Sequence, residues 1–391
     1  MKSDIYELAE KYFNDTVRVR RTIHENPETG FDVQKTAKYV VNELSGTNFK
    51  IKENIGKTGV VCDLNIKGAT KTIALRADMD ALNMQELGEK PYKSKIDGKA
   101  HMCGHDCHTA ILVTTGKILN EIRDRLSVNV RLIFQPCEET IPGGAIFMIK
   151  DGAIDGVDEI YGLHVWTGFE AGTIAVRKGA FMAQPDSFTI TIKGKGGHAA
   201  MPHLTIDPIT AGCSLVQSLN TIVSRNTDPV KDAVLSVTQF NSGTTDNIIP
   251  ESAQIVGTVR TFDNETKDLI IKRMNSVIKG ISESFEVSCE IKYKDGYPVN
   301  YNNEELTENF VETANSIFGE DNVIYPTPPF MGAEDFSYFS QKIPGCFFML
   351  GSGNISKNIV NSVHDPLFEV DEECLKHGVA IMTGVVLSSK I

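Results

Sequence analysis

The spacing of apolar and polar residues changes character along the 391 residues of the chain. Up to about residue 180, stretches of mixed charge with helical spacing alternate with short β-branched runs that are typical of buried strands. The predicted helices are 4–25, 33–45 and 107–124, and the predicted strands are 58–66, 71–78, 128–136 and 158–165. This alternation predicts a mostly parallel sheet covered by helices.

After residue 182 the pattern becomes a strict alternation of apolar and polar residues, as in DSFTITIKG at 186–194, which is typical of a half-buried strand. The following elements are predicted as helix, strand, strand, helix and strand at 207–225, 233–240, 253–262, 265–282 and 285–293. The order βαββαβ is that of ferredoxin-like domains. Helices and short strands then resume after about residue 295.

Two domains are therefore expected. Residues 1–182 and 295–391 are expected to form an α/β domain in two parts, and residues 183–294 an inserted α+β domain. An inserted domain of about 110 residues has an ordinary domain size.

Composition and charge narrow the possible partners and the location. The chain has 39 basic and 51 acidic residues and a formal net charge of −12, which gives no bulk attraction to nucleic acid or anionic lipid. No stretch approaches the ~20 apolar residues of a membrane helix, and the charged start MKSDIYELAEKYF lacks the apolar core of a signal peptide. Eight cysteines are too few for a disulfide scaffold. We expect a cytoplasmic protein that binds neither nucleic acid nor membranes.

The segment AHMCGHDCHTA, at 100–110, combines thiol, imidazole and carboxylate side chains. This set of ligands suits Zn²⁺ and can also hold Mn²⁺ or Co²⁺. Cys103 and His105 are two residues apart, which places both side chains on one face of an extended chain. One cation, or a close pair, could be shared there. On this segment alone, a polar helix N-terminus without an ion remains an alternative.

A pair of carboxylates, Glu138 and Glu139, follows a predicted strand that ends at Gln135–Pro136. Sites in open α/β sheets lie at the carboxyl ends of strands. One of two adjacent carboxylates can bind a cation while the other handles protons, as metal-assisted hydrolysis requires. Taken alone, however, the pair is more simply interpreted as a solvated acidic turn.

Three further segments carry residues of metal-ligand type. His164 ends a predicted strand, His364 lies in a loop before the last helix, and Asp78 and Asp80 end another strand. Each has a structural alternative, because a histidine can simply be hydrogen-bonded and an aspartate can cap a turn. The aspartates could also orient a ligand histidine from behind. Residues of metal-ligand type occur at four predicted sheet or loop ends. Together they predict a metal site more strongly than any one segment does alone.

Seven motifs occur in a fixed order: RADMDAL, HMCGHDCHTA, QPCEET, GLHV, KGGHAAMPH, GAEDFSYF and VHDP. This ordered set, which spans nearly the whole chain, resembles the amidohydrolase branch of the di-metal aminoacylase and carboxypeptidase family. The branch includes hippurate hydrolases, N-acyl-amino-acid amidohydrolases, N-acetyldiaminopimelate deacetylases and auxin-conjugate hydrolases. The resemblance implies a metallopeptidase-like mixed sheet covered by helices, with an inserted ferredoxin-like domain that serves as lid and dimerisation domain.

The resemblance also implies a set of site residues. Two divalent metal ions, of zinc, manganese, cobalt or nickel, would be held by Cys103, His105, Glu139, His164 and His364. Glu138 would be the general acid/base. In a homodimer, His198 would reach the neighbouring subunit's site and stabilise the oxyanion. Asn247 and Arg260 would bind the substrate carboxylate.

The implied reaction is hydrolysis of the amide bond of an N-acyl amino acid to a carboxylate and a free amino acid, with metal-bound hydroxide as the nucleophile. A dipeptidase or carboxypeptidase on the same scaffold is the alternative, since its site residues would be identical. A binding protein with a degenerate site would lack ligands or the general base, and this chain has them all.

Overall fold

The computed structural model describes residues 2–389, which form two compact units. The first unit comprises the chain up to Phe181, Asn300–Pro329 and the residues from Glu334 onward. The second unit comprises Met182–Val299 together with Phe330–Ala333. Each unit has a hydrophobic core of its own.

The first unit contains an eight-stranded sheet with the order β1-β2-β4-β3-β5-β16-β6-β15. Its strands are β1 (Lys50–Ile55), β2 (Gly59–Leu64), β4 (Asn129–Gln135), β3 (Thr72–Asp78), β5 (Glu159–Glu170), β16 (Gly345–Gly353), β6 (Ile174–Ala175) and β15 (Val323–Ile324). The middle strands β4, β3, β5 and β16 are parallel, whereas β1 and β2, β2 and β4, and β16 and β6 pair antiparallel.

The mixed sheet implied by the resemblance is therefore confirmed. The parallel arrangement predicted from the alternation holds for the middle strands, whereas antiparallel pairs flank them on both sides. At the β1 edge of the sheet the cause is local. A short turn joins β1 to β2, and a connection of a few residues can join only antiparallel neighbours. β1 has a mostly exposed, polar sequence, KIKENI, and was not among the predicted strands.

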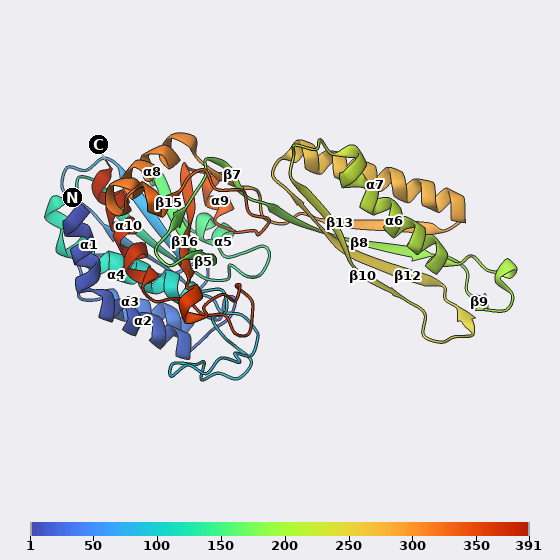
Figure 1. Cartoon of the computed structure of the whole chain (residues 1–391), viewed down its shortest axis with the longest axis horizontal. Helices are drawn as coiled ribbons and strands as arrows, with labels where there is room; N and C mark the ends of the chain where they lie inside the picture. The colour runs from blue at the N-terminus through green and yellow to red at the C-terminus, as the bar shows by residue number, and fades with distance from the viewer. Residues whose placement is uncertain (1, 390–391) are drawn as a thin grey trace. The chain divides into compact units, whose positions relative to one another are not determined.

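Helices surround this sheet in Figure 1. They are α1 (Lys2–Lys11), α2 (Phe13–Glu25), α3 (Gln34–Leu44), α4 (His105–Glu121), α5 (Ala145–Lys150), α8 (Glu304–Phe318), α9 (Ser337–Ser340) and α10 (Cys374–Ser388). A short strand β14 (Asn300–Asn302) pairs with β7 (Gly179–Met182). Helices cover the middle strands, and these strands are therefore largely buried, with every residue of β16 buried.

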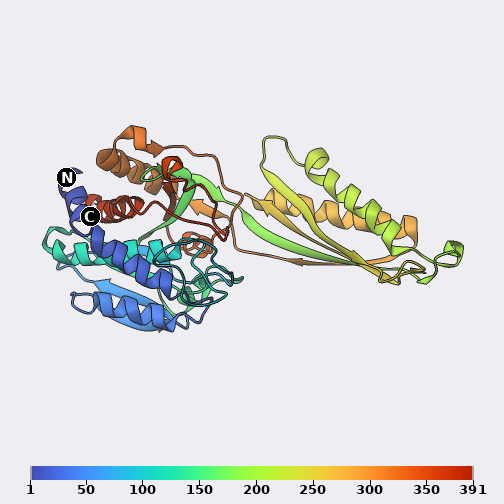
Figure 2. The same ribbon diagram turned by 60° about the horizontal axis from the view of Figure 1, so that its bottom comes forward.

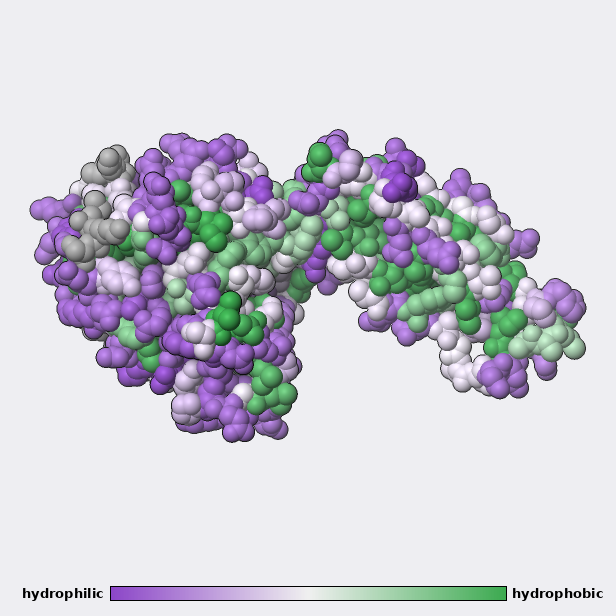
Figure 3. Space-filling model, viewed as in Figure 1, coloured by the Kyte–Doolittle hydropathy of each residue, from purple (hydrophilic) through white to green (hydrophobic). Residues whose placement is uncertain are grey.

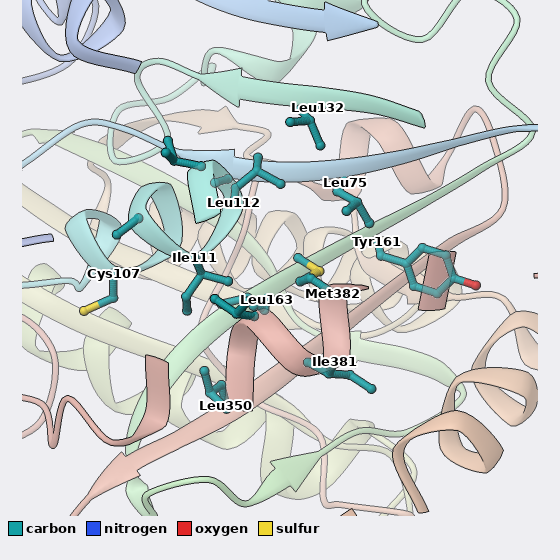
Figure 4. Packing of buried hydrophobic residues seen from close by; sticks show 14 of the residues in the cluster. Leu75, Cys107, Ile111, Leu112, Leu132, Tyr161, Leu163, Leu350, Ile381 and Met382 are labelled. Carbon is teal, nitrogen blue, oxygen red and sulfur yellow. The ribbon is translucent and has the colours of Figure 1, made fainter. Parts of the chain in front are cut away.

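The core of the first unit lies between the sheet and the helices α4 and α10. Figure 4 shows Ile111 of α4 and Met382 of α10 among the leucines of the strands, with Leu163 and Leu350 on neighbouring strands. All four side chains are almost fully buried. This packing fixes the start of α4 against the ends of the middle strands.

The single helix predicted at 4–25 is wrong, because the chain forms two helices that meet at Tyr12. Tyr12 leaves the helical region with φ −94° and ψ 1°, and its hydroxyl donates to Glu121 at 2.6 Å. The break lets α1 contact α8 and α10 while α2 packs against α4. The apolar spacing is helical on both sides of Tyr12, so the sequence pattern does not reveal the change of direction.

The second unit has the predicted βαββαβ order: β8 (Gln184–Lys193), α6 (Pro208–Asn226), β10 (Ala233–Ser242), β12 (Ser252–Thr261), α7 (Asn264–Phe285) and β13 (Ser288–Lys294). The strands form an antiparallel sheet in the order β10-β12-β8-β13. Figures 1 and 2 show α6 and α7 on one face of this sheet. Alternate residues of β13 are exposed, so the other face is polar.

The described surface is of ordinary polarity. Figure 3 shows mainly hydrophilic residues on the visible face of the first unit, with small hydrophobic patches between them. Among the helices of the described residues, none has the length and apolar character needed to cross a membrane.

Candidate metal centre and active site

The candidate residues of the first unit converge because parallel strands bring their carboxyl ends together. β3 lies between β4 and β5 and is parallel to both. Asp78 is the last residue of β3, Gln135 is the last of β4, and His164 lies in β5. α4 begins at His105, directly after the loop that carries Cys103.

Two groups of potential metal ligands share Cys103. Its sulfur lies with His105 and His164 in one group and with Glu139 and His364 in another, and within each group the ligand atoms are within 4.8 Å of one another. Cys103 Sγ is 3.3 Å from His164 Nε2, and His364 Nε2 is 3.2 Å from Glu139 Oε1. The structure thus brings together all five residues that the resemblance assigned to the metals.

The chemistry of these side chains fits cations. Both ring nitrogens of His105 are buried without a hydrogen-bond partner, and buried polar atoms are rarely left so. Burial, followed by the charges of Glu139 and Glu138, raises the pKa of the Cys103 thiol well above its usual value. A thiol in such a place ionises when a cation binds, with release of a proton. Sulfur, imidazole and carboxylate together form a set suited to Zn²⁺ and similar ions.

The backbone around the site holds two of the ligands in place. His164 Nδ1 is 2.7 Å from the carbonyl oxygen of Val165, which it can reach only as a donor, so Nε2 faces Cys103 with its lone pair. His364 has a left-handed φ of 67°, and its backbone N–H donates to Met102 in the loop that carries Cys103, at 2.7 Å. His364 is the one ligand candidate with a half-exposed side chain.

Glycine is required between Cys103 and His105. Gly104 has a φ of +87°, and a Cβ atom there would lie 2.3 Å from Val165 Cγ2. The close approach packs the metal-binding loop against β5, which carries His164.

The two aspartates of RADMDAL support the site in different ways. Asp80 accepts hydrogen bonds from the backbone N–H groups of Glu138, at 2.8 Å, and Glu139, at 3.2 Å, and so fixes the carboxylate pair. Its Oδ1 is also 3.6 Å from Nδ1 of His105. The sequence suggested that these aspartates orient a histidine, but it did not reveal that Asp80 binds the backbone of the glutamates.

Asp78 acts on a different histidine. Its Oδ1 is 2.6 Å from Nδ1 of His108, whose Nε2 accepts a hydrogen bond from the backbone of Val165 at 2.9 Å. Burial lowers the pKa of His108, which keeps Nε2 unprotonated as an acceptor. Through these two hydrogen bonds, His108 holds β5 in place next to His164. His101, the third histidine of its motif, is buried but belongs to none of the potential ligand groups of the described residues.

The two adjacent glutamates have different environments. Burial, then the charges of Glu334, Glu139 and Asp335, raises the pKa of Glu138 well above its usual value. Burial acts in the same sense on Glu139, but a hydrogen bond from His364 and the charge of His105 outweigh it and lower its pKa. One carboxylate of the pair thus favours its protonated form and the other its ionised form.

Sequence reasoning missed a buried acidic pair beside Glu138. Oxygen atoms of Glu334 and Asp335 lie within 4.8 Å of Glu138, and the backbone N–H of Asp335 is 3.4 Å from Glu138 Oε1. The guanidinium of Arg76 is 3.0 Å from each acidic residue of the pair, and Gln135 donates to Asp335 at 2.7 Å. The signal for both residues in the sequence is the motif GAEDFSYF, which contains them.

The three predicted residues of the second unit do not lie together. β9 (Gly197–His198) pairs with β11 (Ile248–Ile249), and Asn247 accepts from Ala199 at 3.0 Å, so His198 and Asn247 are neighbours on an exposed surface. Arg260 lies opposite Pro185, eight residues along β12 from Ser252, or roughly 25 Å at about 3.3 Å per residue. Its Nη1 is buried without a hydrogen-bond partner.

His198 is held in a defined orientation. The backbone N–H of Ala200 donates to its Nδ1 at 3.1 Å, so the proton of the neutral ring resides on Nε2. The exposed Nε2–H can then donate to a group outside the second unit.

A mixed sheet that gathers potential metal ligands and a buried glutamate pair near the ends of its parallel strands is the arrangement of a metal-dependent hydrolase of amide or peptide bonds. The chain belongs to peptidase family M20/M25/M40, whose profile matches residues 74–388. Two divalent metal ions are its cofactors.

Relatives match nearly the whole chain. It is 40% identical over 382 residues to thermostable carboxypeptidase 2 of Saccharolobus solfataricus, covering 95% of this chain and 96% of the relative. It is 38% identical over 370 residues to N-acetylcysteine deacetylase of Bacillus subtilis, covering 94% and 95%. The solved structure of the Bacillus subtilis YXEP protein, a dinuclear metal binding peptidase from the M20 family, matches with a TM-score of 0.84 and 33% identity, covering 97% and 98%.

Proposed function

We propose that this protein hydrolyses the amide bond of N-acyl amino acids and releases a carboxylic acid and a free amino acid. The observation that carries the proposal is the position of Glu138. Its buried carboxyl group lies beside the two ligand groups that share Cys103, and the adjacent Glu139 belongs to one of them. The similarity to a deacetylase of an N-acyl amino acid supports this substrate class.

The cations would be held by Cys103, His105, Glu139, His164 and His364. When bound, they supply Lewis acidity, which polarises a carbonyl group and lowers the pKa of water. Zn²⁺ suits the thiolate, and Mn²⁺, Co²⁺ or Ni²⁺ are alternatives, because availability and geometry decide among such metals.

Glu138 would take a proton from the attacking water and return it to the leaving nitrogen. Its position supports this role, because the 3.4 Å contact from the backbone N–H of Asp335 and the hydrogen bond from its own N–H to Asp80 keep the carboxyl group at the ligand cluster. Arg260 would bind the α-carboxylate of the substrate, since its fork of N–H donors matches a carboxylate and its Nη1 has no hydrogen-bond partner within the protein.

We propose a homodimer in which residues 183–294 act as lid and dimerisation domain for a catalytic domain formed by 1–182 and 295–391. His198 and Asn247 lie at the opposite end of the second unit's sheet from Arg260. One chain therefore cannot easily bring all three to one substrate, but two chains can. The exposed apolar side chains of Met201, Leu204 and Ile248 near His198 suit contact with a second copy.

A reducing compartment such as the cytoplasm suits this chain, because all eight cysteines are free and a thiol is proposed as a metal ligand. A carboxypeptidase or dipeptidase is the second candidate function, and the similarity to thermostable carboxypeptidase 2 is the observation that favours it.

A substrate panel tests the proposal. The protein is reconstituted separately with Zn²⁺, Mn²⁺ and Co²⁺, and amine release is measured from N-acetyl and N-benzoyl amino acids, N-acetyldiaminopimelate, indoleacetyl conjugates and unblocked dipeptides. We expect release from the acylated substrates only. Release mainly from unblocked dipeptides would replace the proposal with the peptidase.

A further inference from the structure

A chain of buried polar side chains lies behind the metal-binding loop and takes no part in the proposed chemistry. Asp106, the residue after His105, accepts a hydrogen bond from Arg20 Nε at 2.8 Å, and its Oδ2 is also 2.8 Å from His24 Nδ1. Arg20, His24 and Asp106 are each no more than 1% exposed. Arg20 and His24 lie on successive turns of α2, so this helix is bound directly to the first turn of α4.

The chain of contacts continues on both sides of Asp106. His24 Nε2 is 3.3 Å from Glu86, whose other oxygen accepts from the backbone N–H of Ser94. Arg20 Nη1 donates to Glu372, just before α10, at 2.9 Å. Four segments that are distant in the sequence are thereby joined at the base of the loop that carries Cys103 and His105.

Buried ion pairs of this kind add little to the free energy of unfolding. Buried ion pairs often contribute no more than well-packed apolar side chains of the same volume, because desolvation offsets their attraction. What an ion pair with several fixed hydrogen bonds adds is a defined geometry. Asp106 and His105 are consecutive residues at the start of α4, so a contact that fixes Asp106 also fixes the orientation of the His105 ring toward the cluster.

We propose that Arg20 and His24 are positioning residues of the metal site, which act through Asp106 to hold the first turn of α4 and its ligand His105. The inference rests on the proposed assignment of His105 and Cys103 as ligands. It explains why two wholly buried polar residues on α2, which touch no member of the ligand cluster in the described contacts, face Asp106.

Substitutions at His24 test the inference through cation binding. His24→Leu removes the contact to Asp106, whereas His24→Asn retains an amide donor near the place of Nδ1. Affinity for Zn²⁺ is measured by competition with a chelator, and the Co²⁺-loaded proteins are compared by absorption spectroscopy. We expect His24→Leu to bind Zn²⁺ about 10–100-fold more weakly with an altered Co²⁺ spectrum, and His24→Asn to recover most of the affinity.

Arg18→Met is the matched control, because Arg18 lies on the same helix and pairs with Asp15 and Glu43, away from the first turn of α4. It should leave Zn²⁺ affinity and the Co²⁺ spectrum unchanged. Arg20→Met, if it folds, should behave like His24→Leu.

Melting temperatures of the cation-free proteins separate a structural role from positioning. Wild-type affinity and spectrum in His24→Leu, whatever its melting temperature, would overturn the inference. A wild-type protein that binds no cation would instead overturn the proposed function, and this inference with it.

Discussion

In the first unit the candidate metal ligands come from separate segments and are mostly buried against one another, whereas in the second unit His198 and Asn247 stand on an exposed surface with few partners. The first arrangement is preorganised: Asp80 fixes both glutamates, and backbone contacts orient His164 and His364. The second is incomplete, because an exposed donor does not define a binding site until something covers it.

The contrast indicates that the two units contribute different steps of catalysis. Cation binding and proton transfer should depend on the first unit alone. Stabilisation of the oxyanion and recognition of the carboxylate should depend on the second unit and on how copies of the chain associate. Substitutions in the two units should therefore have separable effects on metal content, kcat and KM.

The largest effect is expected at Glu138. Glu138→Gln should lower kcat by about 10²–10⁴-fold, because a positioned general acid/base contributes that much, while both cations stay bound. Steady-state kinetics and metal analysis check this, with Glu290→Gln, an exposed site on β13, as the control. A variant that kept a tenth of the wild-type kcat would remove Glu138 from the proton transfer.

The next effect is expected at the exposed end of the second unit. His198→Ala should lower kcat by about 10²–10³-fold, the usual loss of an oxyanion donor, without loss of cations. His203→Ala, in the neighbouring short helix Pro202–Leu204, is the control.

Mixed dimers sharpen this prediction. Activity regained when His198→Ala chains are mixed with Glu138→Ala chains would mean that the two residues act across a dimer. If no activity returned although mixed dimers had formed, action across subunits would be excluded.

A smaller effect is expected at Arg260. Arg260→Lys should raise KM about tenfold with little change in kcat, because an ammonium cannot reproduce the two-pronged contact of a guanidinium with a carboxylate. Arg273→Lys, exposed on α7, is the control. An unchanged KM for every substrate that is turned over would show that Arg260 does not bind the carboxylate.

The smallest effect concerns stability far from the site. Burial raises the pKa of Glu43, but hydrogen bonds from Arg18 and Lys117 outweigh it and lower the pKa to about 2. Because the folded-state value lies below the ordinary 4.5, the stabilisation is complete above about pH 4.5 and is lost as the pH falls toward 2. Glu43→Gln should flatten the decline in the free energy of unfolding over this range by about 1 kcal/mol or less, which melting temperatures measured across the range check. An equally steep decline in the variant would contradict the assignment.

The sequence predicted most of the elements, because their apolar spacing is local. The ends of predicted strands and loops that carry histidine, cysteine and carboxylate side chains indicated a metal site, and the family resemblance named the residues of the first unit that gather there. The break at Tyr12 and the polar edge strand β1 escaped because tertiary contacts, and not local spacing, determine them.

The contacts of Asp106 were also beyond sequence reasoning, because Arg20 is 86 residues away from it and nothing in the local pattern joins the two. The same holds for Glu334 and Asp335, which approach Glu138 from almost 200 residues along the chain. Arg260 shows a different limit of sequence reasoning. Its guanidinium suits a carboxylate, but the sequence did not show that Arg260 and Asn247 lie far apart. Their separation follows from the pairing of β12 with β8 in the structure.

We propose that the first unit holds two cations through a cluster that shares Cys103. The most direct test is a Co²⁺ titration of the wild type and of Cys103→Ser, followed by absorption spectroscopy and metal analysis. We predict two cations per wild-type chain and a sulfur-to-cobalt absorption band that is absent from Cys103→Ser, which should also bind Co²⁺ more weakly. The same band and the same two cations in Cys103→Ser would contradict the account.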